Sequence, residues 1–441
     1  MNWIRQRLES FSERTAFIED SSDFSYADLI NRIDKLKERV RKEVQTAPSI
    51  IGFSFARLSD NLAAILAIAE LKQVAHPIST ELAKAEREEQ LSIASTQWII
   101  ATTSLERTPN ELPHKLVNQL TPKNDAGLIL FSSGTSGAPK AMLHDLNALL
   151  GRYESVRPRN DRTLQLLLAD HIGGLDSAFR TLFSGSTIIV PESRTPTATA
   201  KAIEANRVNI LPASPTFLNL MLLSKVEEQF DLSSLEIIAY GAEAMPQSLL
   251  DKLSKAFPTT DLQQKFGTSE TGAIRIRSVA KGDLAFAIND TDTKWKVIEG
   301  ELWLKTPSRI IGYLNADECS LESDGWYRTG DLVEENSDGS LRILGRCSDF
   351  INFGGQKVHP SEIEAVLLQV EDVHACKVTA KPDPITGSAI HCEITTSGGG
   401  ESLSWKRKLR NHCRGKLAPW KIPSSVSIST DLGVNSRLKR D

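Results

Sequence analysis

The sequence predicts an α/β protein with a large N-terminal domain of layered α/β subdomains plus a small β-rich region, followed by a small mobile α+β C-terminal domain. Three observations predict this architecture. Strand and helix patterns alternate up to about residue 280, short strands with turn signals follow, and a compact mixed module begins near residue 351. At 441 residues the chain is too long for one core. We expect the large domain at 1–345, a hinge at 346–350 and the small domain at 351–441.

Hydrophobic periodicity predicts the elements of the large domain. Residues 27–45 carry apolar positions at helical spacing, which predicts an amphipathic surface helix. A buried strand is expected at 50–55, and a largely buried helix at 60–73 with Asp60 as its N-cap. Further strands are expected at 97–101, 127–131, 164–168, 186–190, 209–211 and 235–240, and helices at 174–183, 197–206, 215–229 and 246–256. This alternation favours largely parallel sheets.

The last third of the chain predicts shorter elements. Strands are expected at 300–305 and 340–344, and a glycine turn at 353–355. The module that follows is expected to contain a helix at 360–368, strands at 373–380 and 389–395, a helix at 401–414 and a strand at 424–428.

Composition and charge exclude several classes of function. A net charge of −4 gives no broad basic surface, so we expect no nucleic-acid partner. The five cysteines form no CxxC pair, which predicts reduced thiols rather than a disulfide set or a zinc site. The N-terminus has no apolar stretch typical of a signal peptide, and the longest apolar run, 62–71, is too short to span a membrane. We therefore expect a cytoplasmic protein.

The segment FSSGTSGAPK at 131–140 concentrates hydroxyls and glycines before Lys140, directly after an expected strand. Glycines let backbone N–H groups approach an anion, hydroxyls add donors, and the lysine adds a positive charge. The segment therefore fits the phosphates of a nucleotide, although its spacing is not that of a Walker A loop. The alternative is a polar surface turn, since Ser, Gly and Pro are common turn residues.

Two later segments place small or polar residues at the ends of expected strands. DHIGG at 170–174 follows the strand expected at 164–168, where α/β sheets bind ligands. Its alternative is an ordinary turn with Asp170 as N-cap. YGAEA at 240–244 would offer a flat backbone surface to a planar base, or it is a tight turn.

Two further segments each present a carboxylate. In FGTSETG at 266–272, Glu270 is a candidate ligand for Mg²⁺, which prefers oxygen ligands, and the hydroxyls are donors to phosphate. The alternative is a solvated loop with one acid. In GWYRTGD at 325–331, Asp331 is suited to accept both hydroxyl hydrogens of a ribose, or the segment is a turn around a packed Trp326.

The segment GRCSDFINFGGQKVHPSEIE at 345–364 combines an arginine, a polar connection, a double glycine and a Pro-Ser-x-x-Glu helix start. By itself it fits a linker followed by a capped helix.

Taken in this order, the segments resemble the adenylate-forming ligases, which include acyl- and aryl-CoA synthetases, nonribosomal adenylation domains and beetle luciferases. The resemblance runs from about residue 125 to the C-terminus and is closest to the acyl- and aryl-CoA ligases. It implies ATP and Mg²⁺ as cofactors and a small carboxylic acid as substrate. It also implies coenzyme A or the phosphopantetheine of an acyl carrier protein as the thiol acceptor.

The resemblance also implies roles for single residues. The catalytic residues would be Lys439, Glu270, Ser269 and His171, with Glu270 on the metal. Asp349 would be the hinge, and Gly354 with Gly355 would line the thiol tunnel. The nucleotide would be bound by Ser132, Ser133, Gly134, Thr135, Ser136, Gly137, Lys140, Gly241, Ala242, Glu243, Phe266, Gly267, Thr268, Asp331 and Arg346. The acid pocket would include His171, Ile172, Gly173, Ala213, Phe217 and Ile274.

The implied reaction has two halves. A carboxylate attacks the α-phosphorus of ATP to give acyl-AMP and pyrophosphate, and the charge that develops is stabilised by Lys439. The small domain then rotates and a thiol attacks the acyl-AMP. The chain departs from the family pattern at Phe266, where an aromatic hydroxyl is usual, at Leu438 in place of a glycine, and at Gly433 in place of a proline.

The predicted acid pocket is mostly apolar, which favours an aryl or medium aliphatic acid over a highly charged one. An amino acid would need a buried carboxylate for its amine, for which Asp170 and Asp176 are the candidates. Three functions stay open from the sequence: a ligase acting on coenzyme A, a stand-alone enzyme loading a carrier protein, and a non-catalytic nucleotide-binding scaffold.

Overall fold

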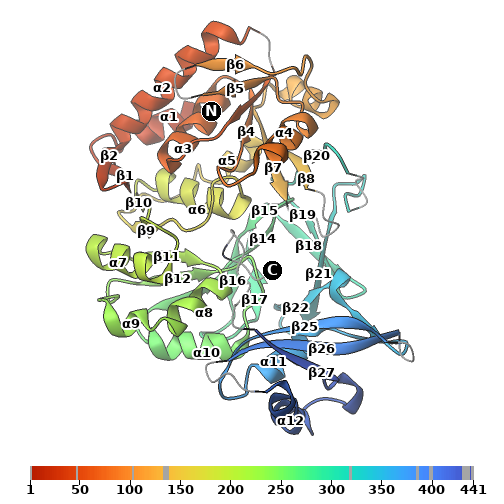
Figure 1. Cartoon of the computed structure of the whole chain (residues 1–441). Coiled ribbons are helices and arrows are strands. Elements are labelled where there is room, and N and C mark those ends of the chain that lie inside the picture. The colour runs from red at the N-terminus through yellow and green to blue at the C-terminus, as the bar shows by residue number, and fades with distance from the viewer. Residues whose placement is uncertain are drawn as a thin grey trace.

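The computed structural model describes residues 2–45, 48–101, 104–132, 139–316, 320–383, 387–396, 401–429 and Leu438. Within these residues three large sheets surround the middle of the chain, and a smaller module lies at the C-terminal end, drawn in blue in Figure 1. The mixed α/β architecture predicted from the sequence is confirmed.

The first sheet is parallel except at its β1–β2 edge. Its order is β13 (Asp261–Gln264), β12 (Ile237–Tyr240), β11 (Ile210–Ala213), β9 (Arg162–Leu164), β10 (Thr187–Ile189), β1 (Thr15–Glu19) and β2 (Ser22–Ser25). One face packs on α7 (Pro196–Asn206), α8 (Pro215–Leu223), α9 (Val226–Gln229) and α10 (Gln247–Ala256). Leu211 and Ile238 from the sheet and Phe217 and Leu253 from the helices form this core.

The second sheet is parallel in its centre and antiparallel towards both edges. Its order is β20 (Gly312–Tyr313), β8 (Lys140–Asp145), β7 (Gly127–Ser132), β4 (Val74–Pro77), β3 (Ile50–Phe53), β5 (Trp98–Ile100) and β6 (Leu105–Arg107). The largest core among the described residues joins this sheet and strands β1 and β10 of the first sheet to α1 (Asn2–Glu9), α2 (Tyr26–Glu43), α3 (Leu58–Glu70), α5 (Leu146–Gly151) and α6 (Ile172–Phe183). Helix α4 (Lys84–Ile93) has no buried residue.

The third sheet is antiparallel and is the small β-rich region. Its order is β16 (Ile276–Ser278), β17 (Phe286–Ile288), β22 (Leu341–Arg346), β21 (Tyr327–Glu335), β19 (Glu301–Lys305) and β18 (Lys294–Ile298). A short hairpin of β14 (Phe266–Thr268) and β15 (Gly272–Ile274) precedes it and shares its core through Phe266 and Ile274.

The C-terminal module has a core of its own, formed by residues from Ile351 to Leu417. It contains the hairpin β23 (Ile351–Phe353) and β24 (Gln356–Val358), and the sheet β25 (Val373–Asp383), β26 (Gly387–Thr396) and β27 (Ser425–Ser429). Helices α11 (Pro360–Leu367) and α12 (Ser402–Cys413) pack on this sheet. The domain boundaries at 345 and 351 remain a prediction.

Three expected elements differ in detail. The strand expected at 164–168 ends at Leu164, because the side chain of Gln165 donates to the carbonyls of Leu167 and Gly174 and the chain turns there. The helix expected at 60–73 begins at Leu58, so Asp60 lies in its first turn and pairs with Arg32 instead of capping. The helix expected at 215–229 is broken where Lys225 adopts φ 49°.

Short elements were missed, including α1, β1, β2, β4 and α4. No disulfide links Cys347, Cys376, Cys392 and Cys413, the four cysteines in the described part of the chain. Within the described residues, each helix is too short or too polar to cross a bilayer.

Candidate active site

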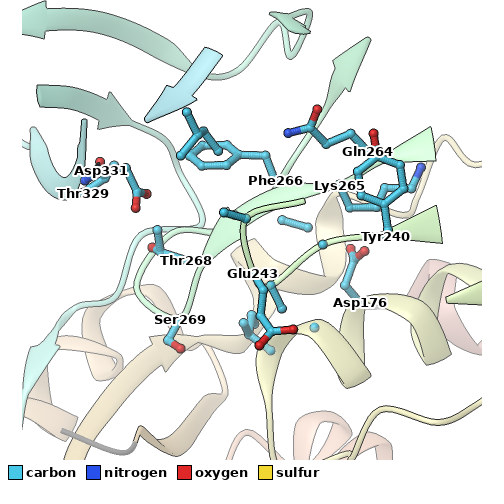
Figure 2. Close-up of a pocket in the computed structure, with 18 of the residues that line it drawn as sticks. Asp176, Tyr240, Glu243, Gln264, Lys265, Phe266, Thr268, Ser269, Thr329 and Asp331 are labelled. Carbon is cyan, nitrogen blue, oxygen red and sulfur yellow. Dashed lines mark hydrogen bonds between the residues drawn. The ribbon is translucent and has the colours of Figure 1, made fainter. Parts of the chain in front are cut away.

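One cavity of about 1720 Å³ lies where the first sheet, the third sheet and the C-terminal module meet. Most of the residues predicted to bind ligands line it, although they come from segments more than 200 positions apart in the chain. In Figure 2, Asp331 and Thr329 lie on one side of the pocket, and Asp176, Lys265 and Tyr240 on the other. These residues form one candidate active site.

Asp331 lies on β21 directly opposite Arg346 on β22. The Arg346 Nη1 atom lies 3.0 Å from Asp331 Oδ1 and also donates to the Thr329 carbonyl at 2.6 Å. Burial raises the pKa of Asp331, and the positive charge of Arg346 opposes that shift. The pair therefore presents an oriented carboxylate to the cavity, with its second oxygen available to a ligand hydroxyl.

Glu270 lies in the turn between β14 and β15, where the hydroxyls of Thr268 and Thr271 contact each other at 3.0 Å. Tyr313 donates its hydroxyl to Glu270 Oε1 at 2.9 Å, and the backbone N–H of Ile310 donates to the Glu270 carbonyl. Burial, and secondly the charge of Glu270, raises the pKa of the neighbouring Tyr327. Two phenols thus hold this carboxylate at the cavity wall beside Ser269.

The predicted phosphate loop connects β7 to β8, whose end residues Ser132 and Lys140 are paired across the hairpin. Both line the cavity, and Lys140 Nζ lies 5.8 Å from the centroid of the Tyr313 ring. The hairpin therefore brings a lysine close to Glu270. Five residues of the prediction, Ser133, Gly134, Thr135, Ser136 and Gly137, lie outside the described residues, as does Lys439.

The turn after β12 carries Gly241, Ala242 and Glu243, which all line the cavity. A Cβ atom on Gly241 would lie 2.8 Å from the Lys265 carbonyl, so the next strand leaves room only for glycine. Glu243 Oε2 accepts a hydrogen bond from the N–H of Thr216 at the start of α8. Its side chain therefore also stabilises a helix N-terminus.

The residues predicted for the acid pocket separate into two groups. His171, Ile172 and Gly173 at the start of α6 line the cavity, as does Ala213 at the end of β11. His171 is the N-cap residue of α6, and its Nε2 lies 3.7 Å from Asp170 Oδ1. Asp170, predicted as the alternative N-cap, is not the capping residue.

Phe217 and Ile274, in contrast, are fully or nearly fully buried in the cores of the first and third sheets. Neither is among the described residues that line the cavity. Their apolar character reflects core packing, which the sequence pattern alone does not distinguish from a ligand pocket.

The connection to the C-terminal module lies at the cavity mouth. Asp349, in a short 3₁₀ turn, lines the cavity together with His359, Ser361 and Lys377 of the module. Ser361 donates its hydroxyl to the Leu344 carbonyl at 2.6 Å. Gly354 and Gly355 form the two-residue turn of the β23–β24 hairpin with φ 56° and 83°. They are not among the described residues that line the cavity.

Several cavity residues were not anticipated as ligand-binding residues, among them Ser177, Arg180, Gln263 and Lys265. A signal existed in α6, where Gly173, Ser177, Arg180 and Ser184 repeat every three or four positions opposite an apolar stripe. Leu438 was also missed as a buried residue. It packs in the core of the first sheet, and its carbonyl accepts the hydroxyl of Ser214.

Comparisons with known proteins agree with this geometry. Residues 4–314 match the AMP-binding enzyme family, and residues 362–435 match its C-terminal domain. A 2-succinylbenzoate–CoA ligase of Bacillus licheniformis is 26% identical over 99% of this chain and 98% of its own length. An indoleacetate–CoA ligase of Aromatoleum aromaticum is 24% identical over 98% of this chain and 94% of its own.

The fold is shared with solved structures. A crystal structure of an anthranilate CoA ligase in complex with anthranoyl-AMP superposes with a TM-score of 0.84 at 20% identity, covering 100% of this chain and 95% of the other. The family match and this superposition confirm the resemblance to adenylate-forming ligases that the sequence motifs predicted. The chain belongs to the AMP-binding enzyme family.

Proposed function

We propose that the protein activates a small carboxylic acid with ATP and then transfers the acyl group to coenzyme A. A carboxylate oxygen attacks the α-phosphorus, a P–O bond forms, and pyrophosphate leaves. The thiolate sulfur of coenzyme A then attacks the acyl carbon, and the C–O bond to AMP breaks. The observation that carries this proposal is a single cavity lined both by the AMP-binding region and by the matched C-terminal region.

The nucleotide is proposed to lie between β21 and the turn after β12. Asp331 accepts the ribose hydroxyls and Arg346 holds that carboxylate in place, because its guanidinium is fixed by Thr329 as well. Gly241 and Ala242 face the base along their backbone. Ser132, Lys140, Thr268 and Ser269 supply hydroxyl and ammonium donors to the phosphates, as positioned donors do in phosphoryl transfer.

Mg²⁺ fits the proposed site through Glu270. Its carboxylate accepts the Tyr313 hydroxyl and makes no ion pair within 4 Å among the described residues, and Mg²⁺ in such sites often takes one protein carboxylate plus substrate phosphates. Among the described residues there is no cluster of three carboxylate, histidine or cysteine ligands, so the substrate phosphates and water would complete the coordination. When bound, the ion supplies positive charge at the phosphates.

Lys439 is proposed as the cation of the first half-reaction. Its neighbour Leu438 is anchored to the large region through its side chain and through the Ser214 hydroxyl. Ser214 follows Ala213, which lines the cavity. The assignment of Lys439 itself, which lies outside the described residues, rests on the resemblance to the family. Asp349 is proposed as the hinge, with Gly354 and Gly355 approaching the site only after rotation.

The function is tested by following both products. The enzyme, ATP and a panel of aryl and aliphatic acids are incubated with coenzyme A or with a pantetheinylated carrier protein, and AMP and thioester are measured by mass spectrometry. We expect acyl-CoA and AMP in equal amounts. Acylation of the carrier protein in preference to coenzyme A would contradict the proposed acceptor, and AMP without any thioester would contradict the second half-reaction.

A further inference from the structure

Helix α6 has two faces with different neighbours. Leu175, Phe179 and Leu182 pack in the large core that contains residues of both the first and the second sheet. The opposite face carries Gly173, Ser177, Arg180, Thr181 and Ser184, and these residues line the cavity. Helix α6 therefore separates the apolar core from the cavity, and it presents small and polar side chains to the cavity.

The first sheet presents a matching face to this cavity. Along the strands, residues of one alternation parity line it, namely Thr163, Ile210, Pro212, Ile237, Ala239, Gln263 and Lys265, and Ala213, Tyr240 and Gln264 join them at the strand ends. The other parity packs on α7, α8 and α10. Parallel sheets are normally covered on both faces, so a face that borders a cavity instead has a functional reason. The space between α6 and this sheet is continuous with the proposed nucleotide site.

Both small residues and cationic side chains line this space. Pro212, Ala239 and Gly173 are small and leave room for the body of a ligand. Arg180 from α6 and Lys265 after β13 line the same cavity, as do Arg157 and Arg159, and the charge of Arg180 acts on Lys265. Arg180 exposes 49% of its side chain although protein surrounds it on most sides, because the exposed surface is the cavity wall.

Two carboxylates, those of Asp161 and Asp176, line this part of the cavity, and both already have cationic neighbours; Asp161 Oδ2 lies 3.7 Å from Arg159 Nη1. The Asp176 Oδ1 atom already accepts the Tyr153 hydroxyl at 2.6 Å and lies 3.8 Å from Arg180. Lys265 Nζ donates only to the neutral side chain of Gln263, at 3.0 Å, among the contacts described for it. Burial lowers the pKa of Lys265 and the charge of Arg180 lowers it further, while the carboxylates of Asp176 and Asp261 oppose the shift without cancelling it. An anion here would relieve that repulsion.

The polar atoms nearby also suit an acceptor group. The Ser177 hydroxyl is buried and has no hydrogen-bond partner in the described part of the chain. It lies one turn before Arg180 on the same face of α6. A carboxylate has two oxygens and accepts from guanidinium, ammonium and hydroxyl groups together.

We propose that the acid activated by this protein carries a second carboxylate at the far end of a compact apolar body, and that Arg180 and Lys265 bind it. The inference rests on the proposed ligase function and names its substrate class. It refines the expectation of an aryl or medium aliphatic acid over a highly charged one, because only the body of the ligand meets the small apolar residues. A terminal amine is disfavoured, since Asp176 is already engaged by Tyr153 and Arg180.

The test compares matched acids in ATP–pyrophosphate exchange: hexanoate, adipate and the aminohexanoate with a terminal amine, and phenylpropanoate with its para-carboxylated counterpart. We expect kcat/KM for each diacid to exceed that of its monoacid by about tenfold or more. Equal values, or a preference for the monoacid or the amine, would overturn the proposal.

Substitutions of Arg180 and Lys265 test whether these two side chains cause the preference for the diacid. Arg180→Gln and Lys265→Gln are each expected to lower kcat/KM for the diacid about tenfold and to leave that for the monoacid unchanged. Lys84→Gln, on the exposed α4, is the matched control. An equal loss for both acids would contradict a role in binding the second carboxylate. If Arg180→Gln fails to fold, which circular dichroism reveals, Lys265→Met carries the same test.

Separate measurements test the proposed ligase activity and the proposed binding of a second carboxylate. Absence of exchange with any acid would contradict the proposed function. Calorimetric binding of adipate and hexanoate to the AMP-loaded wild-type protein decides the inference separately: tighter adipate binding that Lys265→Gln abolishes supports it, and equal binding contradicts it.

Discussion

Asp331 and Arg346 face each other across the β21–β22 ladder, with 3.0 Å between the carboxylate and the guanidinium. Arg346 is the last residue of β22, directly before the connection to the C-terminal module. Strand β22 therefore places a cavity-lining residue at the point where the chain passes to the C-terminal module. A nucleotide bound by Asp331 lies beside any motion of that connection.

The first prediction concerns ribose recognition. Asp331→Asn keeps the shape of the side chain but removes its charge, and we expect kcat/KM for ATP in the exchange reaction to fall about a hundredfold, equivalent to roughly 3 kcal/mol. The discrimination of wild type against deoxyribose analogues of ATP should shrink by the same factor. Asp292→Asn, on an exposed turn, is the control. A variant that still discriminates fully would show that another group reads the ribose.

The second prediction concerns Glu270. Glu270→Gln should raise the free Mg²⁺ concentration needed for half-maximal exchange at least about tenfold, because an amide is a weaker ligand than a carboxylate. Tyr313→Phe removes one hydrogen bond to the same carboxylate and should have a smaller effect in the same direction. The measurement is exchange rate against free Mg²⁺ at fixed ATP. An unchanged Mg²⁺ requirement in Glu270→Gln would remove this residue from the metal site.

The third prediction concerns the packing of the connection. Gly345 has φ 147°, and a Cβ atom there would lie 1.8 Å from the imidazole of His359. Gly345→Ala should therefore displace α11 from β22 and increase cleavage of the 346–350 connection in limited proteolysis. Gly345→Ala combined with His359→Ala should restore part of the protection, because the ring is gone. A double variant as labile as the single one would contradict this clash.

The fourth prediction concerns Leu438, which adopts φ 57° and is 9% exposed. Leu438→Ala keeps the strained backbone and loses roughly 2–3 kcal/mol of side-chain burial. Leu438→Gly loses the same burial but relieves about 1 kcal/mol of strain. We expect exchange to decrease in the order wild type, Leu438→Gly, Leu438→Ala. Thioester formation from supplied acyl-AMP should be unaffected, and a parallel loss there would contradict a role confined to the first half-reaction.

The fifth prediction concerns pH and stability. Burial lowers the pKa of His76 and of His144 to about 3. The unfolded chain therefore binds more protons than the folded chain below the ordinary value of 6.5, and stability falls as the pH drops through that range. Between pH 7 and pH 5.5 the free energy of unfolding should fall by about 2–3 kcal/mol from these two residues.

The matched variant for this test is His144→Leu. Neither imidazole nitrogen of His144 has a hydrogen-bond partner in the described part of the chain, so the substitution removes an unsatisfied polar group. Urea unfolding should show unchanged or higher stability at pH 7 and about half the pH dependence. A pH dependence equal to that of wild type would assign the effect to other groups.

The sequence was informative where chemistry requires particular residue types. Asp331, Glu270 and Lys140 were found because carboxylates and lysines stood beside glycines and hydroxyls, and the structure gathers them around one cavity. The α/β class followed from alternating periodicities. The family assignment drew on the order of several segments, none of which is specific alone.

Which residues line the cavity and which are buried in the cores could not be predicted from the sequence, because it depends on three-dimensional packing. Phe217 and Arg180 illustrate the limit: an apolar residue near a motif proved to be core, and an unremarked arginine proved to line the cavity. Which face of α6 meets the cavity is decided by the core shared by the first and second sheets, which takes Leu175 and Phe179. Leu438 could not be placed from its neighbours, because its contacts come from Ser214, 224 positions earlier.

The central claim is acid activation at this cavity, and ATP–pyrophosphate exchange on wild type and Lys439→Ala tests it most directly. With Lys421→Ala as a lysine control outside the cavity lining, we predict exchange with at least one class of acid and its loss only in Lys439→Ala. Exchange that survives the Lys439 substitution would contradict the assignment of that lysine. Absence of exchange in the wild type with every acid, despite ATP binding, would contradict the ligase function itself.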